Sequence, residues 1–337
     1  MSFDRHTQAA GDLLINRRWP VACWRILTTL SLFLVISSGC QAGANPPAAT
    51  GAPSVSLALL GDIMLGRSVH PSAQTFTYIK PFLKSADLAL ANLESPLTVA
   101  PVQTSSPYAL CAPPGNVRYL AAASLDLLSL ANNHRLDCGE QGLAETQSTL
   151  TEAGLGFIGP DPQPVYREVK GIQLAFLAFD ATGEFHAETA INAVQSARKA
   201  GAVVIVSVHW GLEYQSGAMP DQELIAGQLA EAGAALIWGH HPHVLQPAVW
   251  INHGKTLVLY SLGNALFDQV GLANTRQSAL VLVKVDATGV EEWHAIPFTI
   301  DVVHSQIGKA DPASVQAIMQ YFQLAMSSKG LDAQTRP

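Results

Sequence analysis

Short apolar runs alternate with amphipathic stretches along the chain from Val55 onward. Each run is rich in Leu, Ile, Val or Ala and ends abruptly at polar residues, a pattern typical of strands in sheets that are buried on both faces. The runs are VSLALL (55–60), ADLALA (86–91), LDLLSLA (125–131), IQLAFLAF (172–179), AVVIVSV (202–208), AALIW (234–238) and TLVLYS (256–261). Helical periodicity over residues 139–153 and 221–232 indicates crossover helices. The pattern therefore predicts an α/β fold.

The C-terminal part of the chain has a different pattern. Residues 278–301 are typical of antiparallel strands around a turn at Thr288-Gly289. Helical periodicity returns near residues 314–325. We therefore expect a hairpin and then one last helix that closes the domain.

Polar residues follow directly on most of the apolar runs. They are Asp62, Asn92, Glu94, Asn133, His134, His209, His240, His241, His243 and Asn264. Ligands bind beyond the carboxyl ends of the strands in such sheets, so these side chains could face one cleft. Each residue alone has an ordinary explanation, because Asp and Asn also form helix caps and turns. Together they form the mixed oxygen and nitrogen set that binds Mn, Fe or Zn, so we predict one or two divalent metal ions as cofactors.

The segment IWGHHPH, residues 237–243, holds three of the 11 histidines in the chain. In an extended chain, His241 and His243 lie on one side and can reach one ion or an adjacent pair. The side chain of His240 would lie on the opposite side of the extended chain. It is therefore expected to point elsewhere, in a supporting or a purely structural role.

The first forty residues are typical of a secretory signal. Arg17, Arg18 and Arg25 precede the apolar run 26–36, which is too short to span a bilayer comfortably, and small residues precede Cys40 in a lipobox-like end. Lipidation of Cys40 is predicted, with simple cleavage near it as the alternative. The Pro/Ala/Gly tract 41–54 is expected to be a flexible linker. The protein is thus expected to be exported and lipid-anchored to a membrane, on the periplasmic or extracellular face of the cell envelope.

Charge and cysteine content restrict the expected partners and the expected state of the cysteines. Without residues 1–40 the chain keeps 15 of its 19 Lys and Arg and 24 of its 26 Asp and Glu, so its formal charge is −9. This acidic balance argues against nucleic acid as a partner. Cys111 and Cys138 remain beyond Cys40. In an oxidising envelope they could form a disulfide, and two buried thiols are the alternative.

Six ordered sequence blocks resemble those of the CapA-type poly-gamma-glutamate capsule biosynthesis family. They are GDIMLGR (61–67), NLESPL (92–97), SLANNHRLDCGEQGLAET (129–146), HWGLEY (209–214), GHHPHVLQ (239–246) and YSLGNALFD (260–268). The resemblance implies a branch of the calcineurin-like metallophosphoesterase superfamily, with a four-layer α/β/β/α sandwich of metallo-dependent phosphatase type. It also implies a CapA/metallophosphatase-like domain at residues 55–300, followed by a C-terminal helix and tail at 301–337.

The resemblance also implies metal ligands, among which Glu94 corresponds to a bridging carboxylate. One implied ion has the ligands Glu94, Asn133, His209 and His241, and the other has only Asp62, Glu94 and His243. The second set is short because the superfamily's first block is Asp-x-His, whereas Met64 stands in place of that histidine. The second ion is therefore expected to bind more weakly, or not at all.

The same resemblance implies that His134 is the catalytic acid, placed to protonate a leaving oxygen or nitrogen while metal-activated water attacks. A supporting hydrogen bond to Asp137 or to a ligand is the alternative. Arg67, Glu213 and Tyr214 are placed for substrate contact, Arg67 through its planar guanidinium fork. Ordinary surface positions are the alternative for these three.

Two functions remain open from the sequence. The first is an envelope-anchored metal-dependent hydrolase that acts on a phosphoester, or on an amide in an anionic polymer, during poly-gamma-glutamate biosynthesis, export or anchoring. The second is a non-catalytic factor that binds the polymer or capsule synthesis membrane proteins on the same fold. Met64 favours the second function, and His134 favours the first.

Overall fold

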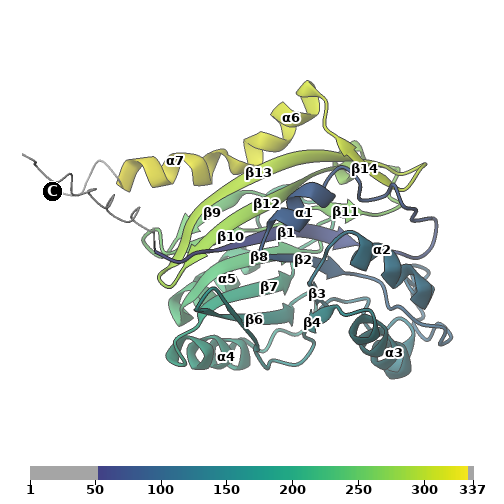
Figure 1. Ribbon diagram of the computed structural model, residues 1–337, viewed down its shortest axis with the longest axis horizontal. Coiled ribbons are helices and arrows are strands. Elements are labelled where there is room, and N and C mark those ends of the chain that lie inside the picture. Colours follow the sequence, from purple (N-terminus) through teal and green to yellow (C-terminus); the bar gives the residue numbers. More distant parts are fainter. Residues whose placement is uncertain (1–51, 333–337) are drawn as a thin grey trace, which may run out of the picture. The chain divides into compact units, whose positions relative to one another are not determined.

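Two β-sheets lie face to face in the computed structural model, which describes residues 52–332 (Figure 1). The eight-stranded sheet has the order β14 (Gln306–Lys309), β13 (Gly289–Asp301), β12 (Gln277–Asp286), β1 (Val55–Ile63), β2 (Leu88–Leu93), β3 (Leu127–Ser129) and β4 (Gly156–Ile158), and β11 (Asn264–Leu266) pairs with β1. The six-stranded sheet has the order β5 (Val165–Val169), β6 (Ile172–Asp180), β7 (Val203–His209), β8 (Ala234–His240), β10 (Thr256–Leu259) and β9 (Ala248–Ile251).

Helices cover the outer face of each sheet. Those on the eight-stranded sheet are α1 (Lys80–Ser85), α2 (Val117–Ala122) and α3 (Gly139–Glu152), and those on the six-stranded sheet are α4 (Ala187–Lys199) and α5 (Pro220–Ala232). Short 3₁₀ turns lie at η1 (Pro114–Asn116), η2 (Ala273–Arg276) and η3 (Gln320–Phe322). The expected four-layer α/β/β/α sandwich is confirmed.

The apolar runs form strands because both of their faces are buried. In β1, Leu57 and Leu59 pack between the sheets, whereas Ala58 and Leu60 belong to the core beneath the helices. Successive side chains of a strand point to opposite faces, so a strand between two cores has no polar position to offer. Carboxylate and imidazole side chains of the apolar runs are therefore found at the strand ends, and a buried hydroxyl such as that of Ser207 is paired with Ser129.

Parallel pairing directs those ends to one edge of each sheet. The strands β1 to β4 run parallel to one another, and so do β6, β7, β8 and β10. The carboxyl ends of parallel strands meet at the same edge, where ligand sites of such sheets form. This geometry brings together the polar residues that follow the apolar runs.

Two of the expected helices are confirmed almost to the residue, as α3 and α5, and the expected hairpin is formed by β12 and β13. The single closing helix was an incomplete prediction. The chain instead forms α6 (Pro312–Met319), the 3₁₀ turn η3 and α7 (Gln323–Asp332), which lie along β13 and β9 (yellow in Figure 1). The tighter turn coincides with Phe322, which is buried in the core between the sheets against Trp293.

The predicted signal segment, Cys40 and the linker as far as residue 51 lie outside the described residues. The predictions of export and lipidation therefore remain predictions, as do the domain boundaries. Over residues 52–332, none of the helices has both the length and the apolar character needed to cross a membrane.

Cys111 and Cys138 form a disulfide, so the first of the two alternatives for these cysteines holds. The bridge joins the loop after β2 to the N-terminus of α3. Next to it, the Leu110 backbone N–H donates to Asp137 Oδ2 at 2.7 Å. The disulfide and this hydrogen bond fasten the same two segments side by side.

Replacing both cysteines, Cys111→Ser with Cys138→Ser, should lower the free energy of unfolding by about 3.5 kcal/mol, because the bridge closes a loop between residues 27 apart. Urea unfolding followed by circular dichroism measures the difference. The reduced wild-type protein is the control and should unfold with the variant. Equal stability of the oxidised wild type and the variant would contradict the expectation.

Candidate metal centre

The strand ends assemble a buried polar cluster between the two sheets. Asp62 lies at the end of β1, Glu94 follows β2, and His209 and His240 end β7 and β8. All four side chains are fully buried. His243 joins them from the segment after β8 and is 2% exposed, so the whole group is shielded from solvent.

Two glycines allow the backbone to pack closely beside this cluster. A Cβ atom on Gly61 would lie 1.8 Å from the Gly263 carbonyl oxygen, and one on Gly239 would lie 2.0 Å from the Tyr260 carbonyl oxygen. Each glycine directly precedes a residue of the cluster, Asp62 or His240. A side chain at either position would therefore displace the strand end that carries the polar group.

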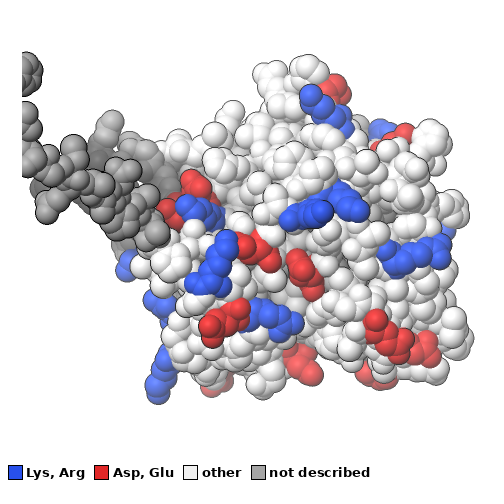
Figure 2. Space-filling model, viewed as in Figure 1, with Lys and Arg blue, Asp and Glu red and all other residues white. Residues whose placement is uncertain are grey.

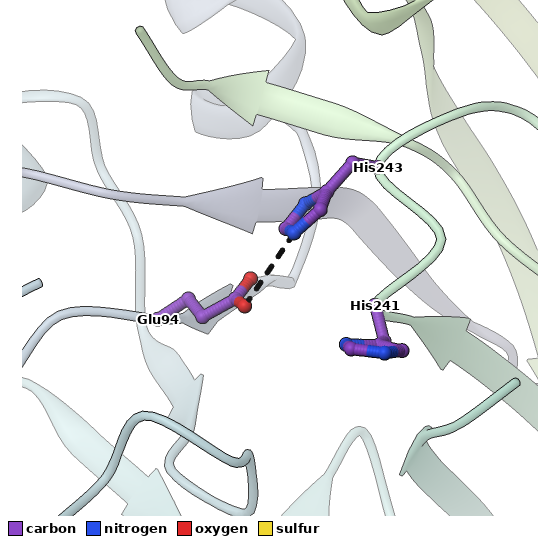
Figure 3. A group of neighbouring side chains, drawn as sticks. All are labelled: Glu94, His241 and His243. Carbon is purple, nitrogen blue, oxygen red and sulfur yellow. Dashed lines mark ion pairs between the residues drawn. The ribbon is translucent and has the colours of Figure 1, made fainter. Parts of the chain in front are cut away.

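Glu94 lies at the centre of the cluster. Its Oε1 atom is 3.5 Å from His209 Nε2, 3.8 Å from His243 Nε2 and 3.9 Å from His134 Nε2. Figure 3 shows Glu94 and His243 pointing toward each other, with His241 beside them. Neither carboxylate oxygen of Glu94 has a hydrogen-bond partner among the described residues. A buried carboxylate without hydrogen bonds needs a cation or a proton.

Asp62 has closer contacts. Its Oδ1 atom accepts a hydrogen bond from Asn92 Nδ2 at 2.8 Å and lies 3.2 Å from His240 Nδ1. Its Oδ2 atom accepts from the His241 backbone N–H at 3.2 Å and lies 3.5 Å from His243 Nδ1. Burial would raise the pKa of Asp62, but the adjacent imidazoles hold this pKa well below its usual value. Asp62 therefore carries a negative charge in the interior.

Burial shifts the pKa values of the other groups in different directions. It raises the pKa of Glu94 to about 8 and lowers the pKa of His209 to about 4 and that of His241 to about 3. For His243, burial lowers the pKa, but the charges of Glu94 and Asp62 outweigh it and raise the pKa to about 9. His209 and His241 are thus neutral at pH 7, the form in which imidazole binds metals.

The residues fit a divalent cation on two independent grounds. Among the described residues, five buried side-chain atoms of this cluster have no hydrogen-bond partner: Glu94 Oε1 and Oε2, His240 Nδ1 and Nε2, and His241 Nδ1. The separations of 3.2–3.8 Å around Glu94 and Asp62 also suit a shared ion, since ligand atoms about 2.0 Å from a tetrahedral zinc lie about 3.3 Å apart.

Two trios have their ligand atoms within 4.8 Å of one another, namely Glu94 with His241 and His243, and Asp62 with Glu94 and His209. Glu94 belongs to both trios, as a bridging residue would. The trios do not follow the predicted division of histidines between two ions, so that division remains a prediction. The structure does bring together every residue predicted as a metal ligand.

Three amides support the imidazoles. Asn133 Oδ1 lies 2.8 Å from His209 Nε2, and Asn92 Nδ2 lies 3.4 Å from His209 Nδ1 on the other side of the ring. Asn264 Oδ1 lies 3.0 Å from His243 Nδ1, so the Nε2 atom of His243 is left facing Glu94. The sequence grouped Asn92 and Asn264 with the cluster, and their role here is to orient the side chains.

His134 lies at the border of the cluster and is held by its neighbours. Its Nδ1 atom is 2.8 Å from Asp137 Oδ2, and its backbone N–H donates to Asn132 Oδ1 at 3.2 Å. Burial lowers the pKa of His134, but the Asp137 hydrogen bond and the Glu94 charge together raise this pKa by more, so the net shift is upward. The supporting bond to Asp137 therefore exists and leaves Nε2 available.

A cavity of about 440 Å³ opens beside the cluster. Its lining residues are Arg67, Ser106, Tyr108, Leu110, Asn133, His134, Glu213, Tyr214, His243, Phe267 and Gln269. The three predicted substrate contacts, Arg67, Glu213 and Tyr214, all belong to this lining. The cavity thus connects these side chains to His134 and His243.

Arg67 has a partner that the sequence interpretation missed. Its guanidinium forms a two-point ion pair with Asp268 and lies 5.7 Å from the centre of the Phe267 ring. Phe267 and Asp268 are the last two residues of the block YSLGNALFD. Their place in a block shared with the family was the only sign in the sequence that they lie near the site. The pair fixes Arg67 at the cavity wall.

The expected direction of His240 was wrong, because its Nδ1 atom lies 3.2 Å from Asp62 Oδ1, but this contact agrees with the supporting role that was one of its two expected roles. Alternating side-chain directions require an extended chain, but β8 ends at His240, and both His241 (φ 93°) and His243 (φ 57°) have positive φ angles. The chain therefore turns sharply, and all three imidazoles converge. Met64 contributes nothing comparable, because it is buried in the apolar core beneath the helices and its sulfur accepts from the Gly66 N–H at 3.1 Å.

Fold and site together define the class: an α/β/β/α sandwich whose strand ends enclose a carboxylate and histidine cluster able to bind metal. Residues 56–269 match the family described as bacterial capsule synthesis protein PGA_cap. The match covers more than half of the chain, so the chain belongs to this family, and the predicted resemblance is confirmed.

Named relatives agree with this membership. The PGA biosynthesis protein CapA of Bacillus subtilis (strain 168) is 31% identical over 275 residues, which cover 73% of this chain and 72% of that protein. The capsule biosynthesis protein CapA of Bacillus anthracis is 31% identical over 280 residues, covering 73% and 67%. A probable polyglutamine synthesis accessory protein of Mycobacterium tuberculosis is 26% identical over 223 residues, covering 56% and 57%.

A solved structure supports the fold. The crystal structure of a hypothetical protein from Thermus thermophilus matches with a TM-score of 0.51 and 16% identity, and the match covers 72% of this chain and 99% of that chain. At this identity the likeness concerns the fold alone.

Glu94→Gln should abolish stabilisation by metal. Mn²⁺ at about 100 times its dissociation constant should stabilise the wild-type protein by about 2.7 kcal/mol, whereas the variant lacks the central carboxylate and should gain little. Without metal, the variant should be at least as stable as the wild type, because burial raises the pKa of Glu94 to about 8 and a neutral amide avoids the cost of ionising this group in the interior.

Thermal unfolding with and without Mn²⁺, after chelation, measures both effects. Glu231→Gln, on the exposed side of α5, is the matched control and should behave as the wild type. Equal metal stabilisation of the Glu94→Gln variant would contradict a role for this carboxylate in metal binding.

Proposed function

We propose that this protein is an envelope-located, metal-dependent hydrolase with a phosphoesterase-type site that acts in the synthesis, export or anchoring of a polyglutamate capsule. The observation that carries the proposal is the Glu94 carboxylate. It is fully buried, has no hydrogen-bond partner among the described residues, faces three imidazoles and lies beside a cavity lined by His134.

The metal ligands are Asp62, Glu94, Asn133, His209, His241 and His243. An ion bound by these residues supplies Lewis acidity and favours the ionisation of water. The protein contributes the dry surroundings, since the side chains of Asp62, Glu94 and His209 are fully buried. It also fixes the rings, because Asn92 and Asn264 lie beside the Nδ1 atoms of His209 and His243.

His134 is the general acid. Asp137 holds its Nδ1 atom at 2.8 Å, so Nε2 is the atom that faces Glu94 and can exchange a proton with a ligand in the cavity. The raised pKa of His134 keeps a larger fraction of this imidazole protonated near neutral pH. A protonated Nε2 donates to the leaving oxygen of a phosphoester or to the leaving nitrogen of an amide.

Substrate recognition takes place at the cavity wall. On the face shown in Figure 2, basic and acidic residues are interspersed, so this face creates no large field of one sign to attract a polyanion. Attraction would come from the cavity itself, whose lining includes Arg67 and which opens beside the residues that would hold the metal. A phosphate or a carboxylate suits both partners.

The context is a capsule polymer on the cell envelope. The names of the two CapA relatives support a role in capsule polyglutamate synthesis, and that of the mycobacterial relative supports association with a polymer synthesis system. The secretory pattern of residues 1–40 and the lipobox-like Cys40 support a lipid anchor in the envelope.

His134→Gln should keep its bound metal but lose about 10²- to 10⁴-fold in kcat, because the variant cannot deliver the proton. The assay is turnover of a chromogenic phosphodiester, with metal content measured on the same sample by elemental mass spectrometry. His70→Gln, at an exposed position, is the control. Undiminished turnover in the His134→Gln variant would remove His134 from the mechanism.

Arg67→Ala should raise KM for the same phosphodiester about tenfold, because one charge-assisted hydrogen bond to the anionic group is lost. The value of kcat should change less, since Arg67 lies at the wall of the cavity and not among the predicted ligands. Arg118→Ala, where the guanidinium stacks on Tyr119 at the surface, is the matched control. An unchanged KM would exclude Arg67 from substrate binding.

A non-catalytic polymer-binding or assembly factor is the second candidate. The burial of Met64 in the apolar core favours it, because the usual second histidine ligand is absent from this position. Fluorescence anisotropy with labelled poly-gamma-glutamate separates the two functions. Binding of the polymer by a metal-loaded protein that hydrolyses neither the phosphodiester nor the polymer would favour this candidate.

A further inference from the structure

The side-chain amide of Asn132 is buried beside the candidate metal centre and is fully hydrogen-bonded. Asn132 is 1% exposed and lies in the segment after β3. Its Nδ2 atom donates to the Leu93 carbonyl oxygen at 2.9 Å and to Asn92 Oδ1 at 3.2 Å. Its Oδ1 atom accepts from the His134 backbone N–H at 3.2 Å. Both amide hydrogens and the amide oxygen thus have partners, which fixes the orientation of the group.

Two of these three hydrogen bonds connect distant parts of the chain. The contact with His134 joins residues two positions apart, as in the turns that Asn side chains commonly close. The bonds to Asn92 and Leu93 instead join residues 40 and 39 positions apart. A turn needs only the Oδ1 atom of Asn132, so the two bonds from Nδ2 require a different explanation.

The bond to Leu93 continues the sheet where β3 has ended. The last residue of β3 is Ser129, and the Leu93 carbonyl lies one residue beyond the last pair of β2 and β3. Asn132 Nδ2 takes the place of the backbone donor that β3 no longer supplies. Glu94 follows Leu93 directly, and its N–H donates to the Ile63 carbonyl oxygen at 2.9 Å. The backbone that carries the Glu94 carboxylate is thus held from both sides.

The bond to Asn92 reaches two more of the proposed ligands. Asn92 Oδ1 accepts from Asn132, so the Nδ2 atom of Asn92 is directed at the cluster. This Nδ2 atom donates to Asp62 Oδ1 at 2.8 Å and lies 3.4 Å from His209 Nδ1. Loss of the Asn132 amide would remove the hydrogen bond that sets the orientation of Asn92.

The backbone of Asn132 is in turn anchored to the facing sheet. Its carbonyl oxygen accepts from Arg135 Nη1 at 2.8 Å, and the same Nη1 atom donates to Asp180 Oδ2 at 2.7 Å. Asp180 ends β6 and pairs in register with His209 of β7. Asn132 therefore has a fixed position relative to both of the sheets that carry the cluster.

We propose that Asn132 is the positioning residue of the metal centre. Through the Leu93 carbonyl it fixes the backbone of Glu94, and through the Asn92 amide it fixes the neighbouring side chains. Asn132 is not itself a proposed ligand and acts only through these contacts. A metal ion binds tightly where its ligands are held in place, so loss of Asn132 should weaken binding. The proposal rests on the metal centre of the proposed function and does not depend on hydrolysis at that centre.

The test compares metal binding by the purified chain with that of two variants. Asn132→Leu is close in size and loses all three hydrogen bonds. Asn132→Ser keeps a hydroxyl that can close the turn to His134 but also loses the two bonds from Nδ2. Equilibrium dialysis against Mn²⁺ gives the dissociation constants, and the visible spectrum of the Co²⁺-loaded protein reports the geometry of the ligands. Circular dichroism shows whether each variant is folded.

In both variants, the dissociation constant for Mn²⁺ should rise about 10- to 100-fold, and the Co²⁺ spectrum should change. Thr256→Val is the matched control, because it removes a buried hydrogen bond at the opposite ends of the strands. That bond runs from Thr256 Oγ1 to the Ala234 carbonyl oxygen at 2.7 Å. The control should unfold at a lower temperature than the wild type but bind Mn²⁺ equally well.

Wild-type Mn²⁺ affinity and an unchanged Co²⁺ spectrum in Asn132→Leu would overturn the proposal and leave the proposed hydrolase intact. Normal binding in Asn132→Ser would also overturn it, because Asn132 would then serve only the turn. This second variant decides alone if Asn132→Leu does not fold. An equal loss of affinity in Thr256→Val would overturn the proposal as well, since affinity would then follow stability. Absence of metal from the wild-type chain would overturn both the proposal and the proposed function.

Discussion

The burial of the Glu94 carboxylate is the constraint on which the rest of the site depends. A carboxylate removed from water, without hydrogen bonds, is unstable unless positive charge or a proton compensates it. In the protein without metal, burial raises the pKa of Glu94 to about 8, and His243, whose pKa rises to about 9, supplies positive charge. A bound cation would do the same more directly. The surroundings of Glu94 are thus better suited to a metal complex than to the free protein.

The two-sheet architecture brings together the residues that surround Glu94. A single sheet could bring Asp62 and Glu94 together, but His209, His240 and His243 come from the facing sheet and its connections. Close backbone packing at Gly61 and Gly239 lets the strand ends of both sheets approach. On the other side of the site, Asp137 connects His134 to the segment that the disulfide fastens. The proposed proton donor and the proposed ligands are therefore positioned by different parts of the framework.

The sequence pattern by itself determined the α/β class of the fold, the helices α3 and α5, and the polar residues that surround the site, because burial on both faces of a strand leaves a pattern that neighbouring residues alone reveal. The four-layer sandwich was implied by the family resemblance. The sequence also included a disulfide between Cys111 and Cys138 as one of two alternatives, and this disulfide is present. Only the tertiary structure decided the direction of His240, the pairing of Arg67 with Asp268 and the location of Met64 in the apolar core. Each depends on a contact between distant segments, or on positive φ angles at His241 and His243 that no periodicity indicates. Local patterns encode which residues are buried, whereas the partners that they meet are set by how the two sheets pack.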